Sequence, residues 1–411
     1  MSPQVSRPSG VPRTSKLRIA VAYYASYVLL GLMLTCIGPS LDALQAQSRS
    51  TTEAIALLFT ANAVGYIVGS LLAGRLYARI PGNRVLPAAL LVLAVLTATV
   101  PWLGSLELLV VVFALIGIPL GVIDVGGNTL LVWLYGDAVP PYMNALHLSF
   151  GIGAFLGPLL FDRVAVATGN AAVTFWPLAV LIVPVALWLT RLPSPDMPKP
   201  TALAGDGRSV LRTHAWLIGL VAAFFFLHMG AELAFGGWIF TYANAVGGSE
   251  TSARLVNSAF WGGLVVGRIV AVPLALRLSA RAMLQLDLVG AIASLALVVA
   301  LPDSTAALVI GTVGFGFWIA SMIPSSFNLA ARRMPITSQV SAAFLVGGSL
   351  GTMTLPWLVG QLFVPQGPLS VIFVTGAALL AASIVFAVIT RLKAARPDEG
   401  RLAAGPGLAP S

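Results

Sequence analysis

The sequence predicts an all-α membrane protein in which twelve transmembrane helices form two pseudo-symmetric six-helix bundles. Three observations predict this fold: the composition, the length of the apolar stretches and an internal repeat. Of the 411 residues, 58% are hydrophobic and only 9% are charged, whereas soluble domains carry about 25% charged residues. The chain is therefore expected to lie in a lipid bilayer.

Polar clusters divide the chain into twelve apolar stretches, each near the length of about 20 residues that crosses a hydrocarbon core. Backbone polar groups in a bilayer must be satisfied within the protein, and a single stretch achieves this only as a helix. The alternating strands of about ten residues that form outer-membrane barrels are absent. The expected helices cover roughly 17–38, 54–74, 85–103, 108–134, 143–161, 171–191, 214–243, 253–275, 283–301, 305–330, 338–362 and 368–390.

The formal net charge of +9 is unevenly distributed. If both termini are cytoplasmic, all but four of the 23 Lys and Arg residues lie on the cytoplasmic side, as the positive-inside rule requires. The exceptions are Arg49, Arg163, Arg254 and Arg268. This pattern predicts a multi-pass protein of a bacterial inner membrane and no nucleic-acid partner. The single Cys36 permits no intrachain disulfide.

An internal repeat supports the division into two bundles. A shift of 198 positions superimposes Gly and Arg residues of the first half on those of the second, and three helix pairs share this register. The matches are Gly65 with Gly263, Gly69 with Gly267, Arg79 with Arg277, Gly153 with Gly351, Pro158 with Pro356 and Gly38 with Gly236. Parallel six-helix repeats are typical of one large class of secondary transporters.

The repeat and the longest polar connection set the expected boundaries. They are a mobile cytoplasmic N-terminus at 1–16, an N-terminal bundle at 17–191, a cytoplasmic linker at 192–213, a C-terminal bundle at 214–391 and a mobile cytoplasmic C-terminus at 392–411.

Several segments resemble known transporters. "GSLLAGRLYARIPGNR" (69–84) resembles the loop motif between helices 2 and 3 of the major facilitator superfamily, although Ala78 replaces its usual Asp and Pro81 lengthens the spacing. "VGGNTLLVWLYG", "MNALHLSFGIGAFLGPLL", "FLHMGAELAFGGWIFTYA" and "SMIPSSFNLA" resemble the fucose permease family, most closely its sodium-dependent glucose transporter-like branch. The resemblance implies cation-coupled transport of a sugar-type solute. Fucose permeases carry an acid in helix 1, where this chain has Thr35.

The fourth apolar stretch contains an acid, Asp124, within "LGVIDVGGNTLLVWLYG". A carboxylate at the centre of a bilayer costs roughly 2.5–3.5 kcal/mol on insertion scales, and such residues usually mark a solute or ion pathway. Gly117, Gly121, Asp124 and Asn128 share one helical face. The alternative is that Asp124 pairs with a buried donor only to fix helix packing.

Other polar residues in the apolar stretches extend the candidate site. Amides donate and accept hydrogen bonds, and Trp can stack on a sugar ring, although Trp is also common at membrane interfaces. The candidate substrate-binding residues are Asn128, Asn144, His147, Trp318, Asn62, Tyr66 and Trp238, and the candidates for cation or proton coupling are Asp124 and Glu232. The candidate structural or gating residues are Gly69, Arg79, Arg268, Gly153, Pro158, Gly351 and Pro356.

Three of the histidines and acids have structural interpretations of their own. His147 fits a clamp between helices as well as it fits a substrate contact, and His228 is interpreted as structural. Asp287 is expected to be a solvated residue near a helix end.

These observations predict a secondary transporter that moves a small polar solute, by cation-coupled symport with alternating access. The sequence has no Walker loop and no His/Cys cluster with metal-ligand spacing, so no cofactor is expected beyond a transported Na⁺ or H⁺. The transporter is expected to function as a monomer in the bilayer. Two alternatives are a proton-coupled exporter of amphiphilic compounds, suggested by "AAFFFLHMG", and a solute sensor that does not transport.

Overall fold

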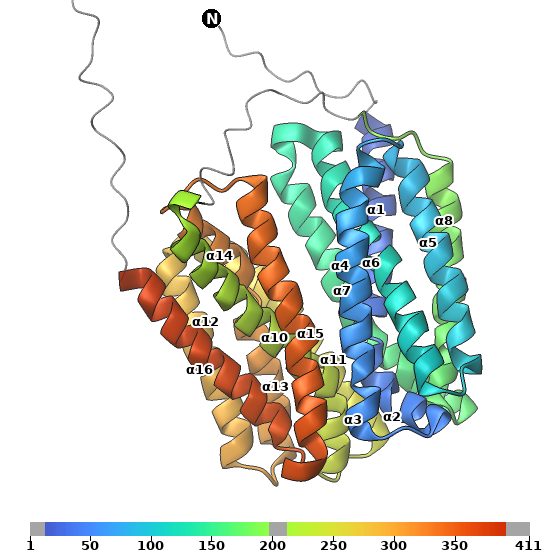
Figure 1. Ribbon diagram of the computed structural model, residues 1–411, viewed down its shortest axis with the longest axis vertical. Coiled ribbons are helices and arrows are strands. Elements are labelled where there is room, and N and C mark those ends of the chain that lie inside the picture. Colours follow the sequence, from blue (N-terminus) through green and yellow to red (C-terminus); the bar gives the residue numbers. More distant parts are fainter. Residues whose placement is uncertain (1–12, 197–211, 392–411) are drawn as a thin grey trace, which may run out of the picture.

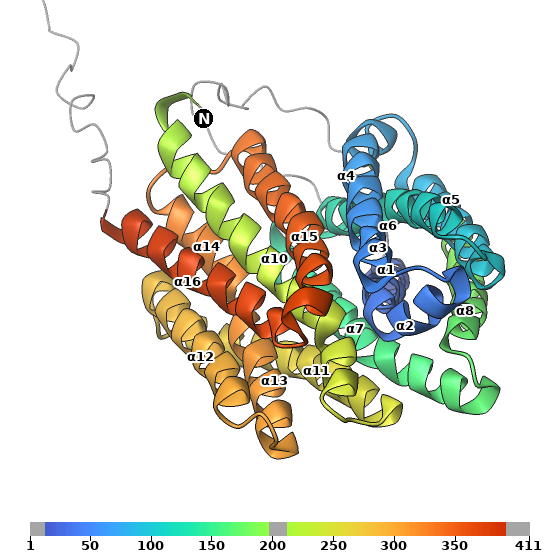
Figure 2. The ribbon, with the colours of Figure 1, turned by 60° about the horizontal axis from the view of Figure 1, so that its bottom comes forward.

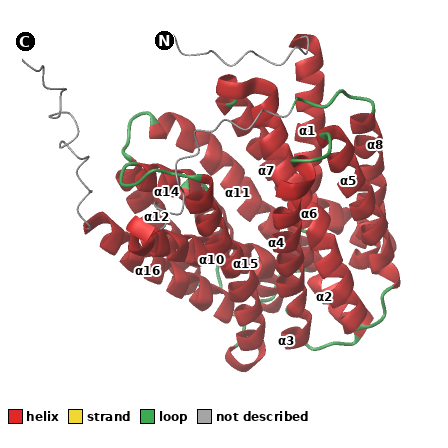
Figure 3. Cartoon of the chain, turned by 45° about the horizontal axis from the view of Figure 1, so that its top comes forward, coloured by secondary structure: helices red, strands yellow, loops and turns green. Residues whose placement is uncertain are grey.

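The computed structural model describes residues 13–196 and 212–391, and every regular element in this part of the chain is a helix (Figure 3). Twelve helical segments among the described residues are long and apolar enough to span a membrane, which confirms the predicted fold class. Most of the predicted termini and linker, residues 1–12, 197–211 and 392–411, lie outside the described residues.

The helices form two groups. The N-terminal bundle consists of α1 (Arg13–Leu34), α2 (Ile37–Ser48), α3 (Thr52–Ile55), α4 (Leu57–Tyr77), α5 (Gly82–Thr99), η1 (Val100–Trp102), α6 (Leu106–Tyr135), η2 (Gly136–Ala138), α7 (Pro140–Thr168), η3 (Ala171–Thr174) and α8 (Phe175–Thr190). The C-terminal bundle consists of α10 (Ala215–Ala245), α11 (Glu250–Ala275), α12 (Ala280–Ala300), α13 (Thr305–Ile319), α14 (Met322–Ala331), α15 (Ser338–Gln366) and α16 (Ser370–Arg391).

Short polar residues begin many of the helices. Ser105, Ser249, Ser279, Ser304 and Thr337 each accept the backbone N–H three residues ahead. These caps satisfy amides that have no intrahelical partner, and the apolar sequence that follows then supplies a continuous membrane helix.

The packing of the two bundles repeats. Gly153 of α7 lies against the backbone of Val28 of α1, with no room for a side chain. Gly351 of α15 lies against Phe226 of α10 in the same way, so both partners are displaced by the 198 positions of the sequence repeat. Small residues allow such close helix contacts in membranes. The structure therefore confirms the pseudo-symmetry.

The two bundles lie side by side and converge at the end that carries α2 and α3 (Figure 1). They diverge toward the opposite end, where α1 begins, here called the α1 end. Hydrogen bonds join the bundles near the α2–α3 end: the Thr60 hydroxyl donates to the carbonyl of Met353 at 3.2 Å, and the Gln361 amide donates to that of Glu53 at 2.9 Å. Figure 2 shows α7 of one bundle beside α11 of the other.

Buried charges also join the bundles at the α2–α3 end. Arg254 of α11 is only 3% exposed, and its Nη1 lies 3.6 Å from Oδ1 of Asp162 on α7. Its Nη2 donates to Glu250 at 2.7 Å. Nearby, the Asn244 amide of α10 donates to Asp42 of α2 at 3.4 Å, and burial raises the pKa of the Asp42 carboxyl above its ordinary value. Because removing one partner of a buried ion pair is strongly destabilising, these contacts favour closure at this end.

The closest backbone approach between the bundles generates a prediction. A Cβ on Gly38 of α2 would lie 2.6 Å from the carbonyl oxygen of Gly237 of α10. We expect Gly38→Ala to disfavour closure of the α2–α3 end by about 1–3 kcal/mol, the usual cost of overpacking. In a Cys36→Ser background, cross-linking of cysteines placed at Thr60 and Met353 should slow about fivefold or more.

Gly74→Ala is the matched control, because a Cβ on Gly74 meets no other atom within 4 Å. Equal cross-linking rates in the Gly38 and Gly74 variants would show that the close contact between Gly38 and Gly237 does not limit closure of the α2–α3 end.

Candidate functional site

Asp124 lies on α6 and is held by three neutral side chains of the N-terminal bundle. The Tyr27 hydroxyl of α1 lies 2.8 Å from Oδ1 of Asp124, and the Tyr66 hydroxyl of α4 donates to Oδ2. The Asn128 amide, one turn along α6, lies 3.3 Å from Oδ1 and donates to the Tyr27 oxygen at 2.6 Å. Three helices thus converge on one carboxyl group.

No cationic side chain forms an ion pair with Asp124 in the described part of the chain, where the two ion pairs both belong to Arg254. Hydrogen bonds from neutral donors stabilise a carboxylate but leave its charge in place. Asp124 is also only partly buried. The arrangement therefore fixes the position of the carboxyl group without pairing it with a cationic side chain of the described residues.

His147 and Asn144 continue the site along α7. Both side chains are exposed and lie about one turn apart. The His147 ring contacts the Tyr27 ring edge-on, with 6.1 Å between the centroids. Tyr27 thus connects the α7 face to the Asp124 carboxylate.

The C-terminal bundle contributes Arg268 and Glu232 opposite this face. Arg268 of α11 reaches across to the N-terminal bundle, where Nη1 lies 3.4 Å from the carbonyl oxygen of His147 and the guanidinium lies 5.9 Å from the centre of the Phe150 ring. Glu232 of α10 is 8% exposed and makes no hydrogen bond within the described residues. Arg268 of the C-terminal bundle therefore contacts the α7 face that carries His147.

Other candidate residues lie away from this cluster. The Asn62 amide donates to the carbonyl of Phe113 at 3.3 Å and so joins α4 to α6. Trp238 is fully buried; its indole donates to the Pro356 carbonyl at 2.9 Å, and its ring packs against Phe59 of the other bundle. Trp318 packs against Gly290 of α12. The structure thus gathers Tyr66, Asn128 and, through Tyr27, His147 near Asp124. Asn144 lies about one turn from His147 on α7, and Asn62, Trp238 and Trp318 make their contacts elsewhere.

The candidate gating glycines and prolines lie at helix contacts. Gly69 of α4 abuts the backbone of Ile118 of α6, and Pro158 is buried within α7. Arg79 is exposed in the connection between α4 and α5. Arg268, the remaining candidate structural or gating residue, forms no ion pair with a carboxylate among the described residues.

The environment of Asp287 differs from the prediction, and Tyr27 was not predicted to be part of the site. Asp287 was expected to be solvated near a helix end, but this prediction was wrong: its side chain packs inside the C-terminal bundle and the residue is only 5% exposed. Tyr27 was not identified from the sequence. A tyrosine inside an apolar span was the available signal, because its hydroxyl needs a partner there.

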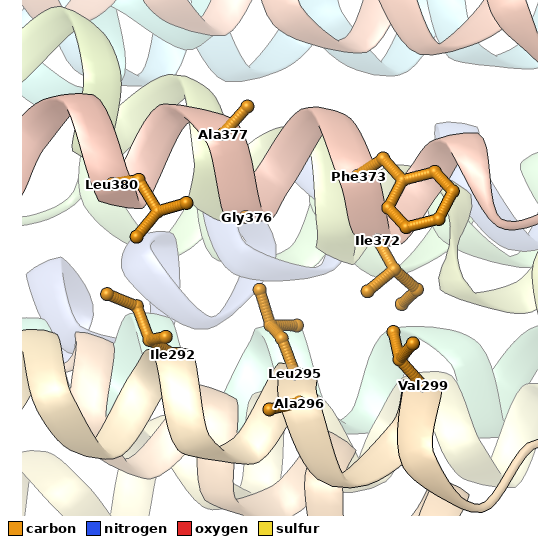
Figure 4. A pocket seen from close by; sticks show the side chains of 9 residues that line it. All are labelled: Ile292, Leu295, Ala296, Val299, Ile372, Phe373, Gly376, Ala377 and Leu380. Atoms are coloured by element: carbon orange, nitrogen blue, oxygen red, sulfur yellow. The ribbon is translucent and has the colours of Figure 1, made fainter.

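A separate cavity of about 280 Å³ lies between α12 and α16 (Figure 4). Its lining is entirely apolar and contains no group that could orient a polar solute. The residues are Ile292, Leu295, Ala296, Val299, Ile372, Phe373, Gly376, Ala377 and Leu380.

Twelve spans in two repeated bundles, with a polar cluster between them, define a secondary transporter. The family model described as Major Facilitator Superfamily matches residues 23–249. The chain belongs to the major facilitator superfamily, a family of membrane transporters rather than enzymes.

The chain is similar in sequence to curated proteins over nearly its whole length. It is 28% identical to sodium-dependent glucose transporter 1A of Mus musculus, with 90% of this chain and 95% of the relative covered. It is 27% identical to sodium-dependent glucose transporter 1 of Homo sapiens, with 92% and 80% covered.

Solved structures show the same fold. The nucleoside transporter NupG superimposes with a TM-score of 0.73 at 14% identity, covering 91% of this chain and 99% of that one. A bacterial homologue of the human lysosomal transporter Spinster gives a TM-score of 0.66 at 14% identity, covering 92% and 96%.

The hydrogen bond from Tyr66 to Asp124 can be tested by a double-mutant cycle. Hydrogen bonds to charged groups contribute about 1.5–3 kcal/mol, so we expect Tyr66→Phe to lower the free energy of unfolding by that amount. In an Asp124→Asn background the same substitution should cost clearly less. Unfolding in a denaturing-detergent titration measures both.

Tyr77→Phe provides the control on the same helix, because the Tyr77 hydroxyl donates to the backbone carbonyl of Val122 at 3.1 Å. Its cost should be the same in both backgrounds. If the Tyr66 and Asp124 substitutions were additive, the two side chains would not be coupled.

Proposed function

We propose that this protein imports a small hydroxylated solute, a sugar, by cation-coupled symport with alternating access between its two bundles. The observation that carries the proposal is the carboxylate of Asp124, which lies in a membrane helix, is held by neutral donors and forms no ion pair in the described chain.

Coupling to a cation follows from the balance of charge. Asp124 and Glu232 are two acids, while Arg268, which contacts the N-terminal bundle, is a single base. When both acids are ionised, one negative charge is in excess, and a monovalent cation neutralises it. Since an uncompensated charge is costly at membrane depth, binding of Na⁺ or H⁺ at Asp124 should ease movement of the site across the bilayer. Glu232 is the second coupling candidate.

A sugar-type solute is supported by both chemistry and similarity. Asn128, Asn144 and His147 offer hydrogen-bond donors and acceptors that suit hydroxyl groups, and Asn144 and His147 are exposed on α7. Two similar curated proteins carry the name sodium-dependent glucose transporter. The four segments that resemble fucose permeases lie in α6, α7, α10 and the α13–α14 region.

The distribution of basic residues supports an orientation. Helix α4, with Arg75 in its last turn, ends at the α1 end, and α5, with Arg84 in its first turn, begins there. We propose this end to be the cytoplasmic side of a bacterial inner membrane. Because the bundles are joined at the α2–α3 end and diverge toward the α1 end (Figure 1), the structure corresponds to a cytoplasm-facing state on this assignment.

Uptake of radiolabelled D-glucose into proteoliposomes tests the proposal. With an inward Na⁺ or H⁺ gradient, the wild-type protein should accumulate glucose above its external concentration. Asp124→Asn should abolish accumulation, because the site no longer carries the charge that the cation neutralises. Exchange of glucose across the membrane without a gradient should persist.

Asp303→Asn is the control, since Asp303 is exposed in the turn between α12 and α13. Unchanged gradient-driven accumulation by Asp124→Asn would remove Asp124 from the coupling mechanism. Thermal stabilisation by lipophilic cations but by no sugar would instead identify the alternative, an exporter of amphiphilic compounds.

A further inference from the structure

A second acid lies inside a membrane span, remote from the Asp124 cluster. Asp287 of α12 is 5% exposed, and its Oδ2 accepts a hydrogen bond from the Ser321 hydroxyl at 2.5 Å. Within the described residues, its Oδ1 accepts no hydrogen bond and no cation forms an ion pair with it. One serine does not offset the cost of a buried carboxylate, so this acid must be neutralised, either by a bound cation or by a proton.

The helix facing Asp287 is interrupted where Ser321 lies. The tenth span breaks between α13, which ends at Ile319, and α14, which begins at Met322. Ser321 occupies the N-cap position of α14, yet its hydroxyl donates to Asp287 instead of capping the helix. The corresponding span of the N-terminal bundle, α6, is continuous from Leu106 to Tyr135. The repeated fold therefore does not impose the break.

The break leaves main-chain oxygens without amide partners. The last carbonyls of a helix have no intrahelical donors, and Pro324 has no N–H to offer the carbonyl of Ala320, four residues earlier. A proline alone is not sufficient to break a helix here, since α6 continues through Pro119. A carboxylate and a hydroxyl thus meet beside a span interruption that frees main-chain carbonyls.

The geometry points to a Na⁺ site formed by Asp287, Ser321 and the carbonyl groups at the α13–α14 break. Hard cations prefer oxygen ligands, and interrupted membrane helices in transporters coordinate Na⁺ through unwound carbonyls and helix C-terminal ends. A single carboxylate is neutralised by a monovalent cation, whereas a divalent ion would leave an excess positive charge in the span. Protonation would neutralise the acid equally well but needs no helix break.

The role of this site in transport rests on the proposed function. The site adds to that function the identity of the coupling ion, Na⁺, and a second place where Na⁺ binds. Binding itself can be measured without any solute. The failure of one proposal is therefore distinguishable from the failure of the other.

The test is thermal unfolding of the purified full-length Asp124→Asn protein, in which the acid of the central site is already neutral. NaCl is titrated against choline chloride, and separately against KCl, at constant ionic strength. The melting temperature should rise with Na⁺ and keep rising logarithmically above the dissociation constant. Adding Asp287→Asn should abolish this rise in melting temperature. Ser321→Ala should increase the Na⁺ concentration that gives half of the rise by about tenfold or more. Asp303→Asn should leave the rise unchanged.

Three results would overturn the site. The first is a Na⁺-dependent rise that persists with Asp287→Asn. The second is a stabilisation that follows pH instead of Na⁺ and disappears with Asp287→Asn, which would identify a protonated acid. The third is used if the Asp287→Asn protein does not fold. It is a Na⁺ affinity that Ser321→Ala leaves unchanged. If the wild-type protein shows the Na⁺-dependent rise in melting temperature but no Na⁺-driven glucose uptake, the result would count against the proposed function alone.

Discussion

The constraint on which this structure depends is a carboxylate at membrane depth that forms no ion pair with a cationic side chain of the described residues. Asp124 is fixed by Tyr27, Tyr66 and Asn128, all within the N-terminal bundle. Because these donors are neutral, they determine where the charge lies without cancelling it. The position of the carboxyl group is therefore set by the N-terminal bundle alone.

The two halves of the chain pack their helices in the same way but differ in their polar residues. Glycine contacts such as Gly153 with Val28 and Gly351 with Phe226 place the helices of both halves in the same arrangement. The polar groups do not follow this symmetry. Asp124 lies in an unbroken span of the first half, whereas the second half carries Arg268, Glu232 and a broken span facing Asp287. The two bundles thus share one packing arrangement but carry different polar groups.

The fold could be predicted because each membrane helix is recognisable from the length and hydropathy of its own segment. Length, hydropathy and the 198-residue repeat located all twelve spans among the described residues, and periodicity alone placed Asp124 and Asn128 on one face. The partners from other helices were harder to predict. Tyr27 reaches Asp124 from α1 only because of how α1 packs, and Trp238, a plausible sugar contact by residue type, instead fills the junction between the bundles. Asp287 seemed solvated from its place near a helix start, yet tertiary packing buries it.

Accessibility of position 124 to water tests the central claim most directly. In a Cys36→Ser background, Asp124→Cys is treated in proteoliposomes with a charged, membrane-impermeant thiol reagent supplied on both sides. Ile384→Cys serves as the comparison, because Ile384 is 67% exposed on α16, an apolar membrane helix. We predict rapid labelling at position 124, slowed by D-glucose, and none at position 384. Labelling of position 124 only by lipid-soluble reagents, or no faster than position 384, would contradict a water-filled site between the bundles.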